Sequence, residues 1–236
     1  MRRRYVLLVV PLLGIIPLLA TNAAEAGRKT IPFADARLKV EVNATDGDAG
    51  LQVFLDGEAW NALSIFNPAG EKILDVQGTG PLMDYGLTEL FSESSEPPFD
   101  VFPLEEFKLL FPEGVYTFQG TTIDGNALVG QATLTHDIPD GPQIVAPSEG
   151  ETVQRDELVI EWEPVATPPG IDVVSYQVLV TRENPLRVFS ADLPATARTM
   201  PVPSEFLEPK TRYKAEVLAI EASGNQTLTE VAFTVK

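Results

Sequence analysis

The sequence predicts an all-β fold of two tandem β-sandwich domains, the first of which carries one short helix. Short apolar runs rich in Val, Ile, Leu and Phe recur along the chain, and each is bounded by Gly, Asn, Asp or Pro. In one run, Leu38, Val40 and Val42 point to one face of a strand, while Lys39 and Glu41 point to the other. The 236 residues are enough for two domains of ordinary size.

The first 26 residues are typical of a secretory signal peptide. Three arginines precede an apolar run at residues 5–20, and Ala24-Glu25-Ala26 presents small residues at the two positions that a signal peptidase recognises. A membrane anchor is the rival interpretation, but an anchor needs about 20 apolar residues, and this run contains two prolines. We therefore predict cleavage after Ala26 and a secreted or periplasmic protein.

The composition excludes several classes of function. Without residues 1–26 the chain keeps 14 basic and 33 acidic residues, and its net charge of about −19 repels nucleic acid and anionic membranes. The absence of Cys excludes a catalytic thiol, a thiolate metal site and a lipoprotein anchor. The single histidine, His136, cannot form a multi-histidine zinc site. No phosphate loop or dinucleotide motif is present, and no cofactor is expected.

The first domain is expected at residues 35–138, after a polar lead at 27–34. Its strands are expected over residues 37–45, 51–57, 62–68, 72–78, 87–93, 114–123 and 127–138. Residues 63–74, LSIFNPAGEKIL, contain an Asn-Pro turn between two apolar runs. This segment resembles the strand–turn–strand unit of bacterial immunoglobulin-like or transthyretin-like sandwiches.

One short helix is expected to interrupt these strands, within LEEFKLLF at residues 104–111. Leu104, Phe107 and Phe111 recur at helical spacing, Pro103 suits the first turn, and Pro112 ends the helix. We expect Phe107 and Phe111 to be buried at one end of the first sandwich.

A linker at residues 139–142, rich in Pro and Gly, leads to the second domain at residues 143–236. Alternation of Leu158, Ile160 and Trp162 predicts that one face of a strand buries the indole. A later strand alternates in the same way. Its inward residues are expected to be Tyr213, Ala215, Val217 and Ala219, and its outward residues Lys214, Glu216 and Leu218.

Residues 141–236 resemble a fibronectin type III domain. DELVIEWEP places Trp162 at the core tryptophan position of that family, and VVSYQVLVTRE places Tyr176 at its usual aromatic position. Leu207 and Tyr213 fall where the family has its leucine and its tyrosine corner. The resemblance implies that these four residues are structural core, and that the domain acts as a spacer or an interaction platform. The Arg-Gly-Asp adhesion tripeptide of some members is absent.

The segment ESSEPPFD, at residues 93–100, gathers Glu93, Glu96 and Asp100 beside two prolines. Two carboxylates could serve a glycoside hydrolase if they faced a sugar from both sides. These carboxylates follow one another in a single loop, so we favour a solvated acidic loop that leads into the helix. Asp100 would then also interact favourably with the helix dipole. All three are expected to be exposed.

Asp46 and Asp48, in the segment DGDAG, are candidates for calcium binding because Ca²⁺ prefers several oxygen ligands from one compact turn. An EF-hand loop needs a further acidic or amide residue and a distal Glu, whereas Leu51 and Val53 lead directly into a strand here. Asp and Gly are also typical of a β-turn, which is the interpretation that we favour.

Taken together, these features predict a non-catalytic binding or structural module of the cell envelope or extracellular space. Its expected partner is another envelope or extracellular protein that offers a basic surface to the acidic loop. No nucleic acid is expected as a partner, and no membrane after signal cleavage. A carbohydrate-binding accessory module that holds a polysaccharide is the first alternative, and a hydrolase that uses the carboxylates of residues 93–106 is the second.

Overall fold

The computed structural model describes residues 28–236, so the predicted signal peptide lies outside the described residues. Within them the fold is all-β, as predicted, and strands far outnumber helices. The first lobe comprises β1 (Thr30–Pro32), β2 (Asp35–Asn43), β3 (Asp48–Phe66), β4 (Lys72–Gln77), α1 (Pro81–Tyr85), β5 (Leu87–Glu93), α2 (Leu104–Leu110), β6 (Gly114–Thr122) and β7 (Ala127–Leu134). The second lobe comprises β8 (Ile144–Ala146), β9 (Glu151–Val153), β10 (Val159–Trp162), β11 (Val173–Arg182), β12 (Arg187–Pro194), β13 (Thr199–Pro201), β14 (Thr211–Glu221) and β15 (Gln226–Val235).

The long strand β3 organises the first lobe. Its first half pairs with β2 and β5, and its second half pairs with β4 and β6. The sequence predicted two separate strands here, at residues 51–57 and 62–68, and this prediction was wrong. The register shifts between Asp56 and Trp60, and such an irregularity lets one strand bend and continue instead of ending in a turn.

Two further expectations for the first lobe need correction. The polar lead at 27–34 contains β1, which pairs in parallel with β7. The lobe also has two helices instead of one, because α1 forms between Gly80 and Gly86, both of which have positive φ. None of the residues of α1 is buried. A five-residue helix without a buried face leaves no apolar periodicity in the sequence, which is why the pattern did not predict it.

The core of the first lobe is apolar and lies between the two halves of β3. Trp60 is completely buried at its centre. Phe107 of α2 is also buried, while Phe111 is half-buried and packs against Phe107 with ring centroids 5.0 Å apart. The helix α2 therefore closes one end of this core, as the spacing of its apolar residues predicted. Neither helix within residues 28–236 has the length and apolar character needed to span a membrane.

The second lobe has the strand arrangement of a fibronectin type III domain, which confirms the resemblance seen in the sequence. One sheet has the order β13-β10-β8, and the other runs β12-β11-β14-β15. Trp162 and Tyr176 are buried between them with ring centroids 5.4 Å apart, and Leu207 and Tyr213 are buried as well. The Tyr213 hydroxyl accepts a hydrogen bond of 2.8 Å from the amide of Glu208, which satisfies the buried oxygen at the tyrosine corner.

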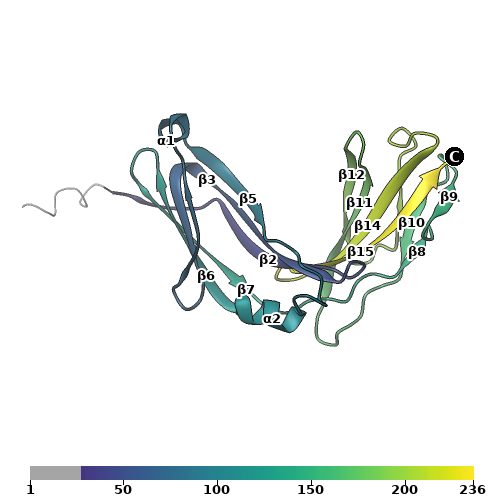
Figure 1. The fold of residues 1–236 in the computed structure, drawn as a ribbon, viewed down its shortest axis with the longest axis horizontal. Helices are drawn as coiled ribbons and strands as arrows, with labels where there is room; N and C mark the ends of the chain where they lie inside the picture. Colours follow the sequence, from purple (N-terminus) through teal and green to yellow (C-terminus); the bar gives the residue numbers. More distant parts are fainter. Residues whose placement is uncertain (1–27) are drawn as a thin grey trace, which may run out of the picture.

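The two lobes meet through main-chain pairing and form a V (Figure 1). β15 runs parallel to β2, with Gln226 opposite Glu41 and Leu228 opposite Asn43, so strands of both lobes belong to one sheet. The expected outward face of β14 is only partly open, because Leu218 is buried. Its cross-strand neighbour Leu228 is one of three β15 residues that pair with β2 of the first lobe, and the junction covers this end of the strand.

Candidate functional site

A groove of about 580 Å³ lies between the lobes and is lined by residues of both. On the first lobe, Arg37, Phe54 and Phe91 stand opposite one another on β2, β3 and β5. The Arg37 guanidinium lies 4.6 Å from the centroid of the Phe54 ring, and Phe91 is 62% exposed. This wall therefore offers an aromatic row that ends in a cation.

The facing wall and the floor of the groove are polar. Gln177 on β11 donates a hydrogen bond of 2.8 Å to Asp192 on β12. Ser223 and Gly224 of the β14–β15 turn, and Gln226 at the start of β15, also line the groove between the lobes. The volume falls within the usual range for small-molecule sites. A groove with one aromatic wall and one amide and carboxylate wall can bind a ligand with both apolar and hydrogen-bonding faces.

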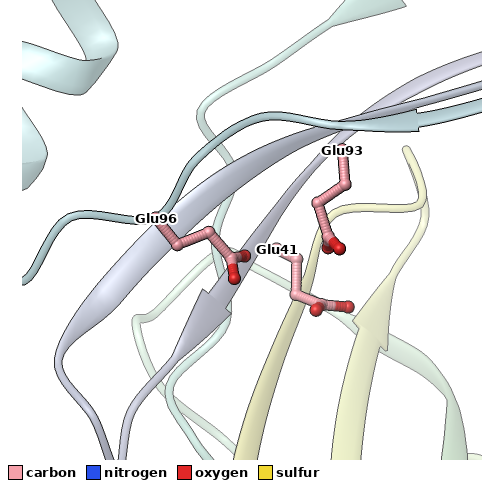
Figure 2. A group of neighbouring side chains, drawn as sticks. All are labelled: Glu41, Glu93 and Glu96. Atoms are coloured by element: carbon pink, nitrogen blue, oxygen red, sulfur yellow. The ribbon is translucent and has the colours of Figure 1, made fainter.

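Next to the groove, three carboxylates converge from different parts of the first lobe. Oxygen atoms of Glu41, Glu93 and Glu96 all lie within 4.8 Å of one another (Figure 2). Glu41 comes from β2, Glu93 ends β5, and Glu96 comes from the loop that follows. The carboxyl group of Glu96 fits against Gly50, where an added Cβ would lie 2.5 Å from its Oε1. The absence of a side chain at Gly50 thus makes room for the third carboxylate.

The close approach of these groups changes their protonation. Burial, and then the charges of Glu93, Asp48 and Glu41, raise the pKa of Glu96 to about 7. Burial also raises the pKa of Glu41, although the hydrogen bond from Gln226 opposes that shift. Burial and the neighbouring negative charges favour the neutral form of these carboxyl groups, whereas the hydrogen bond from Gln226 favours the charged form of Glu41.

Neighbouring amide and amine groups satisfy part of the cluster. Gln52 donates a hydrogen bond of 2.7 Å to Glu93, and Gln226 of the second lobe donates to Glu41. Lys39 donates to the amide oxygen of Gln226 at 2.7 Å, and burial lowers the pKa of Lys39. The cluster is therefore connected to the junction between the lobes.

The acidic loop differs in one respect from the sequence prediction. Glu93 and Asp100 are exposed, as expected. The carboxyl group of Glu96 instead turns toward Glu41 (Figure 2), a residue that we had assigned only to the polar face of a strand. The alternation around Glu41 already placed it on that face, but only the strand register brings it beside residues 93–96.

The two aspartates proposed for calcium lie in the β2–β3 hairpin. Asp46 is exposed and accepts a hydrogen bond from the Asn43 side chain, whose Oδ1 in turn accepts from the amides of Thr45 and Asp46. Asp48 has one buried carboxylate oxygen that finds no hydrogen-bond partner among the described residues. The hairpin is a tight Asx turn, as favoured above, and calcium binding by this pair stays a prediction.

The two tryptophans and His136 lie in structural positions. Trp60 and Trp162 are 0% and 2% exposed, so neither indole can stack on a sugar at the surface. The aromatic row of Phe54 and Phe91 was not singled out in the sequence, because the two residues are far apart along the chain and meet only through strand pairing. His136 lies just after β7, where its ring contacts the carbonyl of Phe111 at 2.9 Å.

Replacing Glu96 by Gln is expected to remove a pH dependence of stability. The pKa of Glu96 is about 7 in the folded chain and close to 4.5 when unfolded, so the folded state binds more protons between these values. Stability should therefore fall as the pH rises from about 4.5 to 7, and solvent screening limits the effect to about 1 kcal/mol. Urea unfolding at pH 5 and pH 8 measures it. From pH 5 to pH 8, the free energy of unfolding of the wild-type chain should fall more than that of Glu96→Gln. An equal change in both chains would contradict the raised pKa of Glu96.

No family model matches the chain, and no curated protein matches it. Among solved structures it is similar to a two-domain fibronectin type III segment of chicken tenascin, with 11% identity, a TM-score of 0.30, and coverage of 86% of this chain and 98% of that one. It is also similar to a tetra-tandem repeat from the extending region of a large adhesion protein, with 15% identity, a TM-score of 0.30, and coverage of 86% and 50%. The FN1–FN3 domains of chicken CNTN1 match with 13% identity, a TM-score of 0.31, and coverage of 88% and 68%. The fold assignment of the second lobe rests on its strand order and its buried corner residues.

Proposed function

We propose that this chain is a non-catalytic binding or structural module that works outside the cytoplasm, and that its two lobes act as one rigid unit. The observation that carries the proposal is Asn225, in the turn between β14 and β15. Its side chain is completely buried, although asparagine is usually found at the surface. A buried polar side chain in this position needs hydrogen-bond partners, and it finds all of them in the other lobe.

Both the oxygen and the nitrogen of the Asn225 side-chain amide form hydrogen bonds with the first lobe. Its Oδ1 accepts a hydrogen bond of 2.8 Å from the amide of Val40 in β2. Its Nδ2 donates to the carbonyl oxygens of Thr135 and Asp137, at 2.9 and 3.1 Å, in the segment after β7. The side chain therefore connects two separate segments of the first lobe, and rotation of the lobes would break several buried hydrogen bonds at once.

Close packing in the linker limits motion further. Gly141 lies so near both lobes that an added Cβ would approach the Thr229 hydroxyl of the second lobe to 2.6 Å and the Ala44 side chain of the first lobe to 2.7 Å. The hydroxyl of Thr227 also donates to the carbonyl of Pro139. A linker held by contacts on both sides favours one fixed angle between the lobes, and such rigidity suits a spacer or a module that presents a binding groove.

The distance between the lobes tests this proposal. The chain contains no Cys, so Glu89→Cys on β5 and Val188→Cys on β12 create unique sites for a pair of spin labels at exposed positions of the two lobes. A rigid unit should give one narrow distance distribution. A broad or bimodal distribution would show that the lobes move independently and would contradict the rigid-unit proposal.

Export is a separate part of the proposal and has its own test. It rests on the basic and apolar segments and the Ala-x-Ala site within residues 1–26. N-terminal sequencing of the native protein should begin at or near Gly27. A chain that begins at Met1 and stays in the cytoplasm would contradict export.

The proposed partner is another envelope or extracellular protein, because the chain is strongly acidic and offers two exposed carboxylates in the loop at 93–100. A basic partner surface would meet this loop, while the groove would take a segment with an apolar face. A polysaccharide is the alternative ligand for the groove, and the row of Phe54 and Phe91 is the observation that favours it. If a gel that contains the polysaccharide retards the wild-type chain but not Phe91→Ala, the result would support that alternative.

Hydrolysis by the acidic cluster is the second alternative. The raised pKa of Glu96 beside two further carboxylates is a feature of general acid sites. The side chains of Gln52 and Gln226 already occupy the cluster, however, and none of the three carboxylates lines the groove. Release of reducing sugar by the wild-type chain but not by Glu96→Gln would overturn the non-catalytic proposal.

A further inference from the structure

One end of the first lobe carries apolar side chains that the core does not use. In the helix α1, Leu82, Met83 and Tyr85 are 43%, 48% and 84% exposed. Ile123, in the turn between β6 and β7, is 40% exposed and lies against Gly86, where an added Cβ would approach its Cγ2 to 2.9 Å. We call Leu82, Met83, Tyr85 and Ile123 the apolar tip. Contiguous exposed apolar side chains commonly mark a contact surface.

The described chain enters the fold beside this tip. The Arg28 guanidinium donates a hydrogen bond of 3.0 Å to the Thr121 hydroxyl, and the backbone amide of Lys29 donates to the Asn126 side chain at 3.2 Å. Thr121 and Asn126 flank the turn that carries Ile123. Figure 1 shows the beginning of β1 and the helix α1 at the same end of the first lobe, away from the second lobe.

The length of chain before Arg28 limits how far the tip can lie from the apolar run at residues 5–20. The apolar run at residues 5–20 ends only eight residues earlier. An extended segment of that length spans at most about 28 Å. Before cleavage after Ala26, while this signal segment is engaged with the membrane during export, Arg28 and the adjoining tip therefore stay within about 28 Å of the apolar run.

The net charge around the tip is closer to zero than the net charge of the whole chain, and this favours contact with a lipid surface. The whole chain has a formal net charge of −17, but Arg28 and Lys29 offset Asp84 and Asp124 at this end. Tyrosine beside basic residues is typical of the boundary between lipid and water. A zwitterionic lipid surface would not repel this tip. The same surface would have no favourable interaction with the acidic loop at 93–100.

We propose that the apolar tip contacts the lipid surface of the membrane that the N-terminal apolar run enters, with α1 toward the bilayer and the groove directed away from it. The inference rests on the export proposed above. Four exposed side chains are a marginal anchor by themselves, as is a single lipid chain. The contact therefore depends on the attached apolar run, and cleavage after Ala26 weakens it and releases the chain.

Fluorescent labels at two single cysteines test the contact. Tyr85→Cys carries an environment-sensitive dye on the tip, and Leu109→Cys carries the same dye on α2 at another part of the lobe, with a parent side chain that is 82% exposed. The full chain is reconstituted into phosphatidylcholine vesicles with nitroxide groups on the acyl chains. The label at position 85 should brighten about twofold in unlabelled vesicles and be quenched by the nitroxide, and the label at 109 should not. Equal responses at the two positions would overturn the proposal.

Two controls distinguish lipid contact at the tip from self-association and test its dependence on the apolar run. The chain that begins at Gly27 should respond to the same vesicles about tenfold more weakly, because it lacks the apolar run; an equal response would overturn the dependence on that run. A response at position 85 in concentrated protein without vesicles would show self-association and would overturn lipid as the occupant. A native chain that begins at Met1 would contradict cleavage without affecting the labelling result, so failure of the export proposal and failure of this one are distinguishable.

Discussion

Replacement of Trp162 by Ala should lower the free energy of unfolding by about 3–5 kcal/mol, the largest effect that we expect from a single substitution. The indole is 2% exposed and packs between the two sheets of the second lobe against Tyr176. Removing it leaves a cavity, and the loss of burial adds to the cost of that cavity. A change of this size is a large part of the stability of an ordinary domain.

Urea unfolding of the full chain, followed by far-ultraviolet circular dichroism, measures the effect. Trp60 is then the only tryptophan, and its fluorescence reports on the first lobe separately. Trp162→Phe is the mild variant, because the indole nitrogen has no hydrogen-bond partner among the described residues and an aromatic ring still fills most of the space. Val174→Ala, at a side chain that is 50% exposed on β11, is the surface control. An unchanged midpoint for Trp162→Ala would show that the indole does not hold the two sheets together.

Replacement of Asn225 by Leu should destabilise the chain by about 3 kcal/mol and release the angle between the lobes. Leucine has the same number and branching of side-chain heavy atoms but no polar atoms, so the amide of Val40 and the carbonyls of Thr135 and Asp137 would lose their partner. Each buried group left without a partner costs about 1–3 kcal/mol, although water that enters the opened junction would recover part of it.

The spin-label pair at positions 89 and 188 distinguishes this effect from a simple loss of stability. At a urea concentration where both chains are folded, the distance distribution of Asn225→Leu should be broader than that of the wild-type chain. Asn225→Asp retains the acceptor for Val40 but places a carboxylate oxygen against the carbonyls of Thr135 and Asp137, so it should broaden the distribution as well. Gln154→Ala, at an exposed amide in the second lobe, should leave the distribution unchanged. A narrow distribution in Asn225→Leu would mean that strand pairing alone fixes the lobes.

The acidic residues show where a prediction from sequence reaches its limit. The composition of residues 93–100 was enough to predict an exposed acidic loop, and Glu93 and Asp100 are exposed. The approach of Glu96 to Glu41 depends on two facts that the sequence does not contain. One is the register that places Gly50 opposite Glu41 on β3, and the other is the path of the loop over that glycine. The raised pKa of Glu96 follows from this arrangement and not from the local sequence.

The β14–β15 turn, residues 222–225, is a similar case. Its sequence is that of an ordinary polar turn. Asn225 is buried because the first lobe covers the turn, and no local pattern reports contact with a segment more than 180 residues away. The same contact explains why the alternation on β14 failed at Leu218, since alternation describes the two faces of a strand but not what covers the outer one.

The sequence by itself determined the all-β class, the positions of most strands, the helix over residues 104–110 and the buried corner residues of the second lobe. These features follow from apolar periodicity, turn residues and local spacing, which act over a few neighbouring positions. Only the tertiary structure decided the bend of β3, the aromatic row of the groove, the acidic cluster and the junction at Asn225. Each of these depends on strand register and on contacts between distant segments, and a one-residue change of register would move Glu41, Phe54 and Phe91 to the other face of their strands.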